Sequence, residues 1–350
     1  MIEQLQRQRY ISTRPVGEEE FYDVHRILRL KIQLHMDDYG FDTSFRKAFR
    51  LIRKAFPQTD KTQVPLPKEM EICKRYMPHL DSFFWIFKGR ADECGTLAAS
   101  GSRGRALDVA KLFYDAGFYV YGSQRTAYDG FPFVEMAERI LDDIKEPPDN
   151  KIRADIHCVT GLLHLYTDGP ARTKGTERLR KTWEIRRRIY IEDSTQDNDV
   201  LSQNAANDYS VCLMNMYQFD EVDEIIRGCF KRYQIWGPES ENPFEYSKYY
   251  GNYSAVLLWQ GKVEEAIWHV ERSLDLTQKF SGRGTHYYRR MFWLACILLQ
   301  AGDVQASFEK HMEVLNARLE LHGKHHENTI LSLYAVAATY HHLGDLSSAM

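Results

Sequence analysis

The sequence predicts an all-α protein in which pairs of helices stack into a solenoid. Four stretches align with one another, namely 207–222, 251–266, 292–307 and 334–349. Each stretch carries a small residue near its start and a second small or medium-sized residue twelve positions later, with a glycine between them in three of the four. Small residues allow two neighbouring helices to approach closely, and glycine tolerates the left-handed backbone at a helix end. Helix pairs that recur at such spacing are typical of solenoids.

The two recurring positions define the register of this repeat. The first is occupied by Ser210, Ser254, Ala295 and Ala337, and the second by Val222, Ala266, Ser307 and Ala349. Successive units begin 44, 41 and 42 residues apart. A large side chain follows three positions after the first small residue, on the same helical face, and is expected to fill the seam between helices. These seam residues are Leu213, Leu257, Leu298 and Tyr340.

The turn between the two helices of a unit is predicted at the glycines. These are Gly261, Gly302 and Gly344, whereas Tyr217 takes the corresponding place in the first unit. Because a residue with a side chain is strained where glycine fits, we expect a less regular turn at Tyr217.

Further helix pairs are predicted upstream, where the repeat is weaker. Residues 151–190 contain an apolar helix, a loop and a basic amphipathic helix, and residues 107–144 suggest another pair. Pro147 and Pro148 separate these two units, because proline disrupts a helix. We therefore expect about six helix pairs over 107–350, the last of them truncated. Solenoids need a capping element that covers the last apolar face. Because the sequence shows no such element after the last unit, we also expect the chain to be part of a longer protein.

The amino-terminal residues read differently from the repeats. A β-prone stretch over 19–24 is followed by helical patterns that run up to Lys88. The sequence predicts a separate small domain over 1–88 and a linker over 89–106, where glycine, serine and alanine accumulate.

The repeat resembles the tetratricopeptide repeat, particularly the long variety of kinesin light chains and of many fungal proteins. The connecting segments that carry this likeness are 236–247 and 322–333, whereas 280–288 departs from it. The amino-terminal part resembles the winged-helix segment that precedes the repeats in fungal NLR-like signalling proteins of the STAND class. Its matching positions are His25, Arg26, Ile27 and Leu28, then Ala55, Phe56 and Pro57, then Pro78, His79 and Leu80.

These resemblances imply a right-handed tetratricopeptide-like solenoid preceded by a small winged-helix-like domain. They also imply a non-catalytic region that binds a protein or peptide partner, as the sensor part of an NLR-like protein. The alternative is a free-standing adaptor, similar to kinesin light chains, that captures short peptide segments. A third hypothesis is an enzyme, which would require an enclosed pocket with converging ionisable groups.

By the same resemblance, the first helix of each unit lines a concave groove that holds the partner. Asn207 and Asn252 are expected to clamp a peptide backbone, because an amide side chain both donates and accepts hydrogen bonds. Lys248 and Arg289 are expected to pair with acidic side chains, and Trp259 to serve as an aromatic anchor. The remaining expected groove residue is Asn204. In the alternative interpretation, the two asparagines satisfy neighbouring helix ends and Trp259 closes a turn.

No cofactor is expected from the sequence. It contains no G-x-x-x-x-G-K-[ST] string for phosphate binding, so we assign nucleotide binding only to a domain outside this chain. Five histidines near the end could suggest a metal site, but no cysteine accompanies them and the first three fall in a variable loop. They are His322, His325, His326, His341 and His342.

Composition favours a cytoplasmic protein without a nucleic-acid or membrane partner. The 350 residues carry a formal net charge of −3, and the basic run 186–190 is expected to form a solvated helix face. The longest apolar run, 291–299, is much shorter than the roughly 20 residues that cross a bilayer. The amino terminus lacks an apolar signal core. The six scattered cysteines contain no CxxC pair and are expected to be reduced thiols.

Overall fold

The computed structural model describes residues 7, 11–16, 19–24, 38–59, 67–123, 126–165 and 170–344. The chain divides into two compact units, Met1–Ala55 and Phe56–Met350. The first unit contains strands β1 (Ile11–Val16) and β2 (Glu19–Val24), which pair antiparallel, and helix α3 (Asp38–Ala55). The strand predicted over 19–24 is thus confirmed, whereas the His25–Leu28 motif lies outside the described residues.

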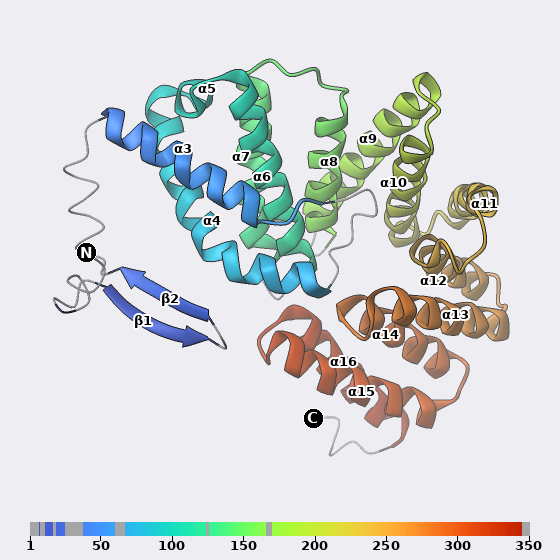
Figure 1. The fold of residues 1–350 in the computed structure, drawn as a ribbon. Coiled ribbons are helices and arrows are strands. Elements are labelled where there is room, and N and C mark those ends of the chain that lie inside the picture. Colours follow the sequence, from blue (N-terminus) through green and yellow to red (C-terminus); the bar gives the residue numbers. More distant parts are fainter. Residues whose placement is uncertain are drawn as a thin grey trace. The chain divides into compact units, whose positions relative to one another are not determined.

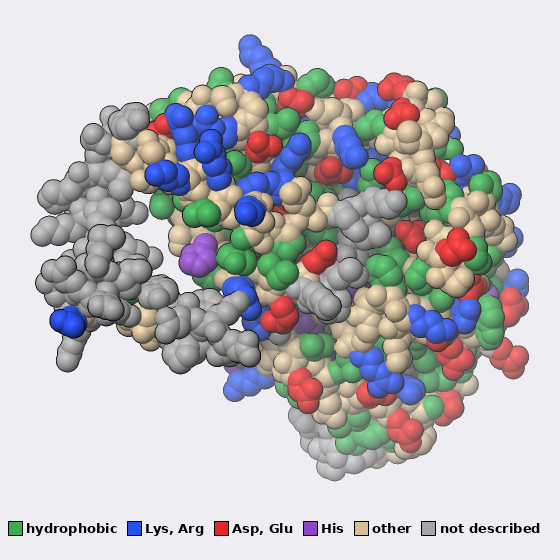
Figure 2. All heavy atoms as spheres, in the orientation of Figure 1, with side chains coloured by type: hydrophobic (Ala, Val, Ile, Leu, Met, Phe, Trp, Pro, Cys, Tyr) green, Lys and Arg blue, Asp and Glu red, His purple; other side chains and the backbone are tan. Residues whose placement is uncertain are grey.

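Helix α3 is strongly amphipathic. Phe45, Phe49 and Ile52 recur at a spacing of four and three residues and share one face. Basic residues occupy much of the rest of the helix. Two of them, Arg53 and Lys54, lie in its last turn, where their positive charge interacts favourably with the negative end of the helix dipole. Figure 2 shows Lys and Arg side chains gathered over α3, whereas basic and acidic side chains are interspersed over the other described elements on this face.

The second unit is all-α in its described residues, and consecutive helices pack against each other as in a solenoid (Figure 1). Its helices are α4 (Pro67–Cys94), α5 (Thr96–Ser100), α6 (Arg103–Gly122), α7 (Ala127–Asp143), α8 (Lys151–His164), α9 (Pro170–Glu192), α10 (Gln196–Asn215), α11 (Phe219–Trp236), α12 (Pro243–Trp259), α13 (Val263–Ser281), α14 (Thr285–Gln300), α15 (Val304–His322) and α16 (Glu327–His342). Five pairs run from α6 to α15, and α16 packs on α15.

Both recurring positions of the repeat lie in the helix interfaces. Ser210, Ser254 and Ala295 are fully buried at the first position, and Val222, Ala266 and Ser307 are fully buried at the second. In the last unit, Ala337 is half-buried and Ala349 lies outside the described residues. The predicted register is therefore confirmed over the first three units.

The turns within these units share one geometry. Gly261 and Gly302 have φ values of 76° and 87°, and Tyr217 adopts the same left-handed conformation with φ 60°. The residue after each of them donates a backbone hydrogen bond to the carbonyl five positions earlier, at 3.0 Å from Gln218 to Leu213 and at 2.9 Å from Lys262 to Leu257. The less regular turn expected at Tyr217 is therefore not observed, because these helix-ending bonds hold the residue in its strained conformation.

The segment 89–106, which the sequence predicts to be a linker, is mostly helical. It completes α4, forms α5 and begins α6, and the hydroxyl of Thr96 donates to Asp143 of α7 at 2.7 Å. Its small residues have a different role from the one expected. Gly101 ends α5 in the left-handed conformation, and Ser102 caps α6 by accepting from the Arg105 N–H.

The basic run of α9 is also placed differently from expectation. Arg186 is only 2% exposed and forms an ion pair with Asp155 of α8 at 2.8 Å, whereas Arg188 is half-exposed and pairs with Asp149. An ion-pair partner on the preceding helix, Asp155, thus accompanies the inward orientation of one residue of this run. In the described part of the chain, no helix is both long enough and apolar enough to cross a membrane.

Candidate binding cavity

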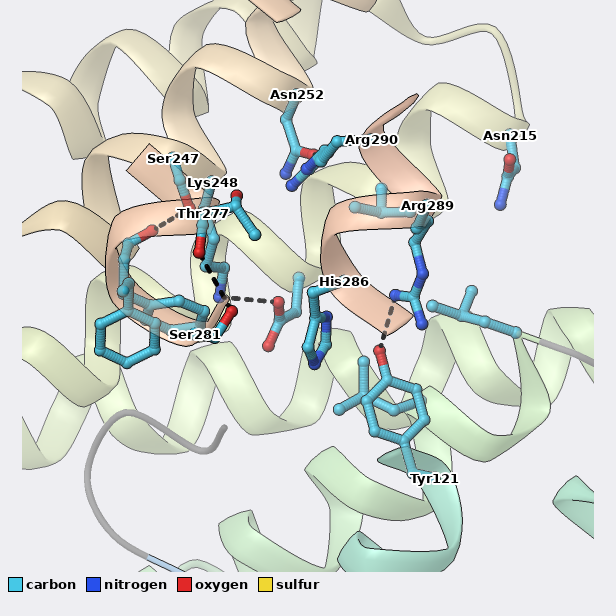
Figure 3. A pocket seen from close by; sticks show the side chains of 16 residues that line it. Tyr121, Asn215, Ser247, Lys248, Asn252, Thr277, Ser281, His286, Arg289 and Arg290 are labelled. Atoms are coloured by element: carbon cyan, nitrogen blue, oxygen red, sulfur yellow. Dashed lines mark hydrogen bonds and ion pairs between the residues drawn. The ribbon is translucent and has the colours of Figure 1, made fainter. Parts of the chain in front are cut away.

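A cavity of about 300 Å³ opens among the helices of the second unit. Its walls come from α6, α8, α10, α12, α13 and α14, so that the first helices of several successive pairs meet around it (Figure 3). We call it the cationic cavity and define it by its polar lining residues, which are Tyr121, Asp208, Asn215, Ser247, Lys248, Asn252, Thr277, Ser281, His286, Arg289 and Arg290.

One column of repeat positions reaches this cavity. Asn204, Lys248 and Arg289 are separated by 44 and 41 residues and so occupy the same place in three successive units. The Lys248 ammonium lies 3.4 Å from the Asn204 side-chain oxygen and forms an ion pair with Asp208 at 2.9 Å. Arg289 donates to the Tyr121 hydroxyl at 3.3 Å, which joins α14 to α6. The repeat thus places Lys248 and Arg289 in the cavity wall and buries Asn204 beneath Lys248.

Asn207 and Asn252 contact each other, and of the two only Asn252 lines the cavity. Asn207 is fully buried, and its amide group donates to the Tyr233 hydroxyl at 2.9 Å. Asn252 donates to the Asn207 side-chain oxygen at 2.6 Å and accepts from Arg290 at 3.1 Å. We call this series Arg290–Asn252–Asn207–Tyr233 the polar ladder. Asn207 therefore has an interior role, because a side chain without solvent exposure cannot bind a peptide.

Trp259 lies apart from the cavity lining, at the end of α12. Its ring stacks on Phe219 of α11 at a centroid distance of 5.2 Å, and 53% of its surface remains exposed. This placement beside the turn at Gly261 agrees with the alternative interpretation, in which the tryptophan closes the turn between helices.

Most of the polar lining residues were not predicted from the sequence, among them Asp208, Arg290, His286 and Tyr121. Asp208 occupies the same repeat position as Asn252, 44 residues earlier, so the alignment contained a signal for it. Arg290 and His286 belong to the same helix as Arg289 but carry no repeat signal of their own. Tyr121 comes from α6, outside the aligned units, and only the folded chain brings it to Arg289.

The electrostatics of the cavity are cationic. Among the residues that the structure describes, Lys248, Arg289 and Arg290 line it together with one carboxylate, that of Asp208. Figure 3 shows His286 between Lys248 on one side and Arg289 with Tyr121 on the other. Burial and then these three cations lower the pKa of His286 to about 3, so its imidazole is neutral at pH 7.

A second cavity of about 600 Å³ adjoins the first. It lies between α4, α6, α13, α14 and α15 and shares Ser281 and His286 with the cationic cavity. Apolar side chains such as Met70, Met77 and Leu321 line part of it. The two spaces therefore meet at His286.

The structure offers no metal centre within its described residues, where no group of three or more His, Cys, Asp or Glu side chains could hold an ion. Of the candidate histidines, His322 and His326 stack at 4.5 Å, and His326 caps α16 by accepting from the Asn328 N–H. The six cysteines are free thiols, and burial raises the pKa of Cys158 and Cys229 to about 12. These two thiols are therefore not activated nucleophiles at neutral pH.

Comparison with known proteins adds no assignment. No family model matches the chain, and no curated protein matches it.

Proposed function

We propose that this chain is a non-catalytic interaction region that binds an extended peptide segment of a partner protein in its cationic cavity. One observation carries the proposal: Lys248 and Arg289, at the same position of successive units, both line one cavity with their charged side chains. An extended peptide also presents its side chains at regular intervals, so a cavity wall whose charged residues recur from unit to unit can bind it. The positive charges of Lys248 and Arg289 favour a partner segment that carries acidic groups.

The biological setting follows from the resemblances. In this proposal the solenoid is right-handed and tetratricopeptide-like, follows a winged-helix-like domain, and forms the sensor region of a cytoplasmic NLR-like protein. Ala55, Phe56 and Pro57 support it, because α3 ends at Ala55 and the family pattern closes a helix on Phe-Pro. The kinesin-light-chain-like adaptor would use the same cavity for cargo peptides. A P-loop domain encoded in frame upstream would favour the NLR-like role over the adaptor.

Selection of a phage-displayed random peptide library on the protein tests the peptide-binding function. We expect enriched acidic peptides whose affinity, measured by calorimetry, falls at least tenfold in the double variant Lys248→Glu, Arg289→Glu. Lys262→Glu is the matched control, because Lys262 is exposed in the turn between α12 and α13 and does not line the cavity. Enriched peptides that bind the double variant as tightly as the unaltered protein would refute cavity binding.

A further inference from the structure

The turns α10–α11 and α12–α13 expose large apolar side chains beside each other. Met216, Tyr217 and Trp259 are 46%, 83% and 53% exposed. The ring of Phe219 joins them, because it meets Tyr217 edge-on at a centroid distance of 6.4 Å and stacks on Trp259 at 5.2 Å. We call Met216, Tyr217, Phe219 and Trp259 the aromatic edge. None of these four residues lines the cationic cavity, so the edge is a separate surface.

The fold of the turn does not require these side chains. The turn α14–α15 has the same left-handed geometry, yet it carries Gln300, Ala301 and Gly302, with Gln300 in the place of Trp259. Tyr217 stands in the place of Gly302 and holds a backbone conformation that strains a residue with a side chain. Strain that persists at so exposed a position is typical of functional sites, and contiguous exposed apolar side chains mark interaction surfaces.

The charges beside the aromatic edge indicate which partner it suits. Residues 216–221 and 259–265 carry four carboxylates, Asp220, Glu221, Glu264 and Glu265, and one cation, Lys262. The four carboxylates are exposed, and none of them forms an ion pair with a residue that the structure describes. They also recur in register, because Asp220 and Glu264 are 44 residues apart and open successive second helices. Charge complementarity therefore favours a cationic partner.

We propose that the aromatic edge binds an arginine-rich segment of a partner protein. A guanidinium group stacks on aromatic rings and pairs with carboxylates at the same time, and tryptophan is the best ring for this contact. The chain itself contains such an arrangement on α11, where Arg227 lies over the Tyr253 ring at 5.5 Å and pairs with Asp223 at 2.8 Å. The edge offers rings and carboxylates of the same kind to a second protein. This surface does not depend on the cavity, and neither proposal requires the other.

Calorimetry with three acetylated peptide amides tests the chemistry of the partner. Each peptide consists of four Gly-Xaa repeats, with arginine, lysine or citrulline at Xaa. Citrulline keeps the planar shape of arginine without its charge, and lysine keeps the charge without the planar group. We expect the arginine peptide to bind at least fivefold more tightly than the lysine peptide and at least tenfold more tightly than the citrulline peptide. Equal affinity for lysine would overturn the stacking, and equal affinity for citrulline would overturn the role of the carboxylates.

Substitution of the rings tests the position of the site. Trp259→Ala and Tyr217→Gly are each expected to weaken binding of the arginine peptide at least fivefold. Tyr217→Gly should not lower the melting temperature, because glycine adopts the left-handed backbone without strain, so a purely structural role of this tyrosine is tested separately. Tyr128→Ala is the matched control, because Tyr128 is 70% exposed and contacts one ring, Phe131. Unchanged affinity in both Trp259→Ala and Tyr217→Gly would overturn the inference.

Substitution of the carboxylates tests the charge. The double variant Asp220→Asn, Glu264→Gln is expected to weaken binding of the arginine peptide at least threefold. The double variant Glu135→Gln, Glu320→Gln removes the same charge from exposed positions on other helices and should not alter it. Equal losses in both double variants would show that only the overall charge of the protein matters and would overturn the site.

Sedimentation velocity tests the other occupant, a second copy of this chain. We expect the proportion of monomer to be the same in the unaltered protein and in Trp259→Ala. A dimer that Trp259→Ala abolishes, together with an arginine peptide that does not bind, would assign the aromatic edge to self-association and overturn the inference.

Discussion

The helix pairs α6–α9 and the helices α10–α14 are held together by different means. In the first region, glycines bring helices into direct contact. A Cβ atom at Gly117 would lie 2.6 Å from a Val134 methyl carbon, and one at Gly161 would lie 2.6 Å from the Leu179 side chain. In the second region, serine and alanine occupy the close positions, and the polar ladder crosses from α11 through α10 and α12 to α14.

This difference assigns the two regions separate tasks. Close apolar contact stabilises α6–α9 through packing density. In α10–α14, some of that packing is replaced by hydrogen bonds that lead from the buried Tyr233 to Arg290 in the cavity wall. The second region thus positions cationic side chains, whereas the first contributes Tyr121 and Leu162 to the cavity wall. The four predictions below test this division, from the largest expected effect to the smallest.

Arg186→Ala is expected to cause the largest loss of stability. Arg186 is the most deeply buried charged residue of the glycine-packed region, and its removal leaves a cavity and an Asp155 carboxylate without its ion-pair partner. Breaking a buried ion pair in this way lowers the free energy of unfolding by about 3–5 kcal/mol. Urea denaturation measures the change. Arg188→Ala on the same helix is the control, because its half-exposed pair with Asp149 contributes less than about 1 kcal/mol. Equal losses in both variants would contradict the burial of Arg186.

Acid is expected to destabilise the protein through His311 of α15. Burial and then the charge of Arg318 lower the pKa of His311 to about 4 in the folded state, from its usual value of 6.5. Between these two values the unfolded state binds more protons, so stability falls as the pH decreases. The contribution is at most about 1.4 kcal/mol per pH unit and about 3 kcal/mol over the whole window.

The pH dependence of His311→Leu checks this assignment. Urea denaturation at pH 7, 6 and 5 should show a shallower loss of stability than in the unaltered protein, whereas His325→Ala, at an exposed position, should retain the full slope. Burial also lowers the pKa of His157, His286 and His322 to about 4, 3 and 4, so part of the slope persists in the variant. Identical slopes for His311→Leu and the unaltered protein would show that His311 titrates normally.

Asn207→Ala tests the polar ladder itself. The variant leaves the Tyr233 hydroxyl and the Asn252 amide group without their partner, which costs about 1–3 kcal/mol. Asn215→Ala provides the comparison, because Asn215 lies exposed on the cavity wall and its loss should change stability by less than about 0.5 kcal/mol. Denaturant melts of both variants give the answer. A silent Asn207→Ala would show that the polar ladder does not contribute to stability.

The repeat register was predictable from the sequence because it depends on residue size. Two helices cannot approach unless small residues meet, so Ser254 and Ala266 had to be interior. The inward turn of Arg186 was not predictable, because its partner Asp155 lies on another helix and no local pattern links the two. The same limit applies to 89–106, where Gly101 and Ser102 lie at helix ends that no local pattern indicated.

The cavity was predictable only in part, for a reason of helical geometry. Lys248 and Arg289 occupy one repeat position and therefore one face, which the alignment specified correctly. Asn207 aligns with Gly251 rather than with Asn252. One position along an α-helix rotates a side chain by about 100°, enough to turn Asn207 from the cavity into the interior. The contribution of Tyr121 to the cavity could not be predicted, because only the folded chain brings α6 close to Arg289.

Trp259→Ala is expected to have the smallest effect of the four variants. It should lower the free energy of unfolding slightly and leave the affinity for library peptides unchanged. Its loss removes the stack on Phe219, which contributes about 0.5–1.5 kcal/mol beyond the area that it buries. A double-mutant cycle with Phe219→Ala measures that coupling by urea denaturation. Affinity for library peptides should remain within about twofold, because the ring lies outside the cavity lining. A tenfold loss of affinity would instead extend the binding surface to the end of α12 and weaken the assignment of recognition to the cationic side chains alone.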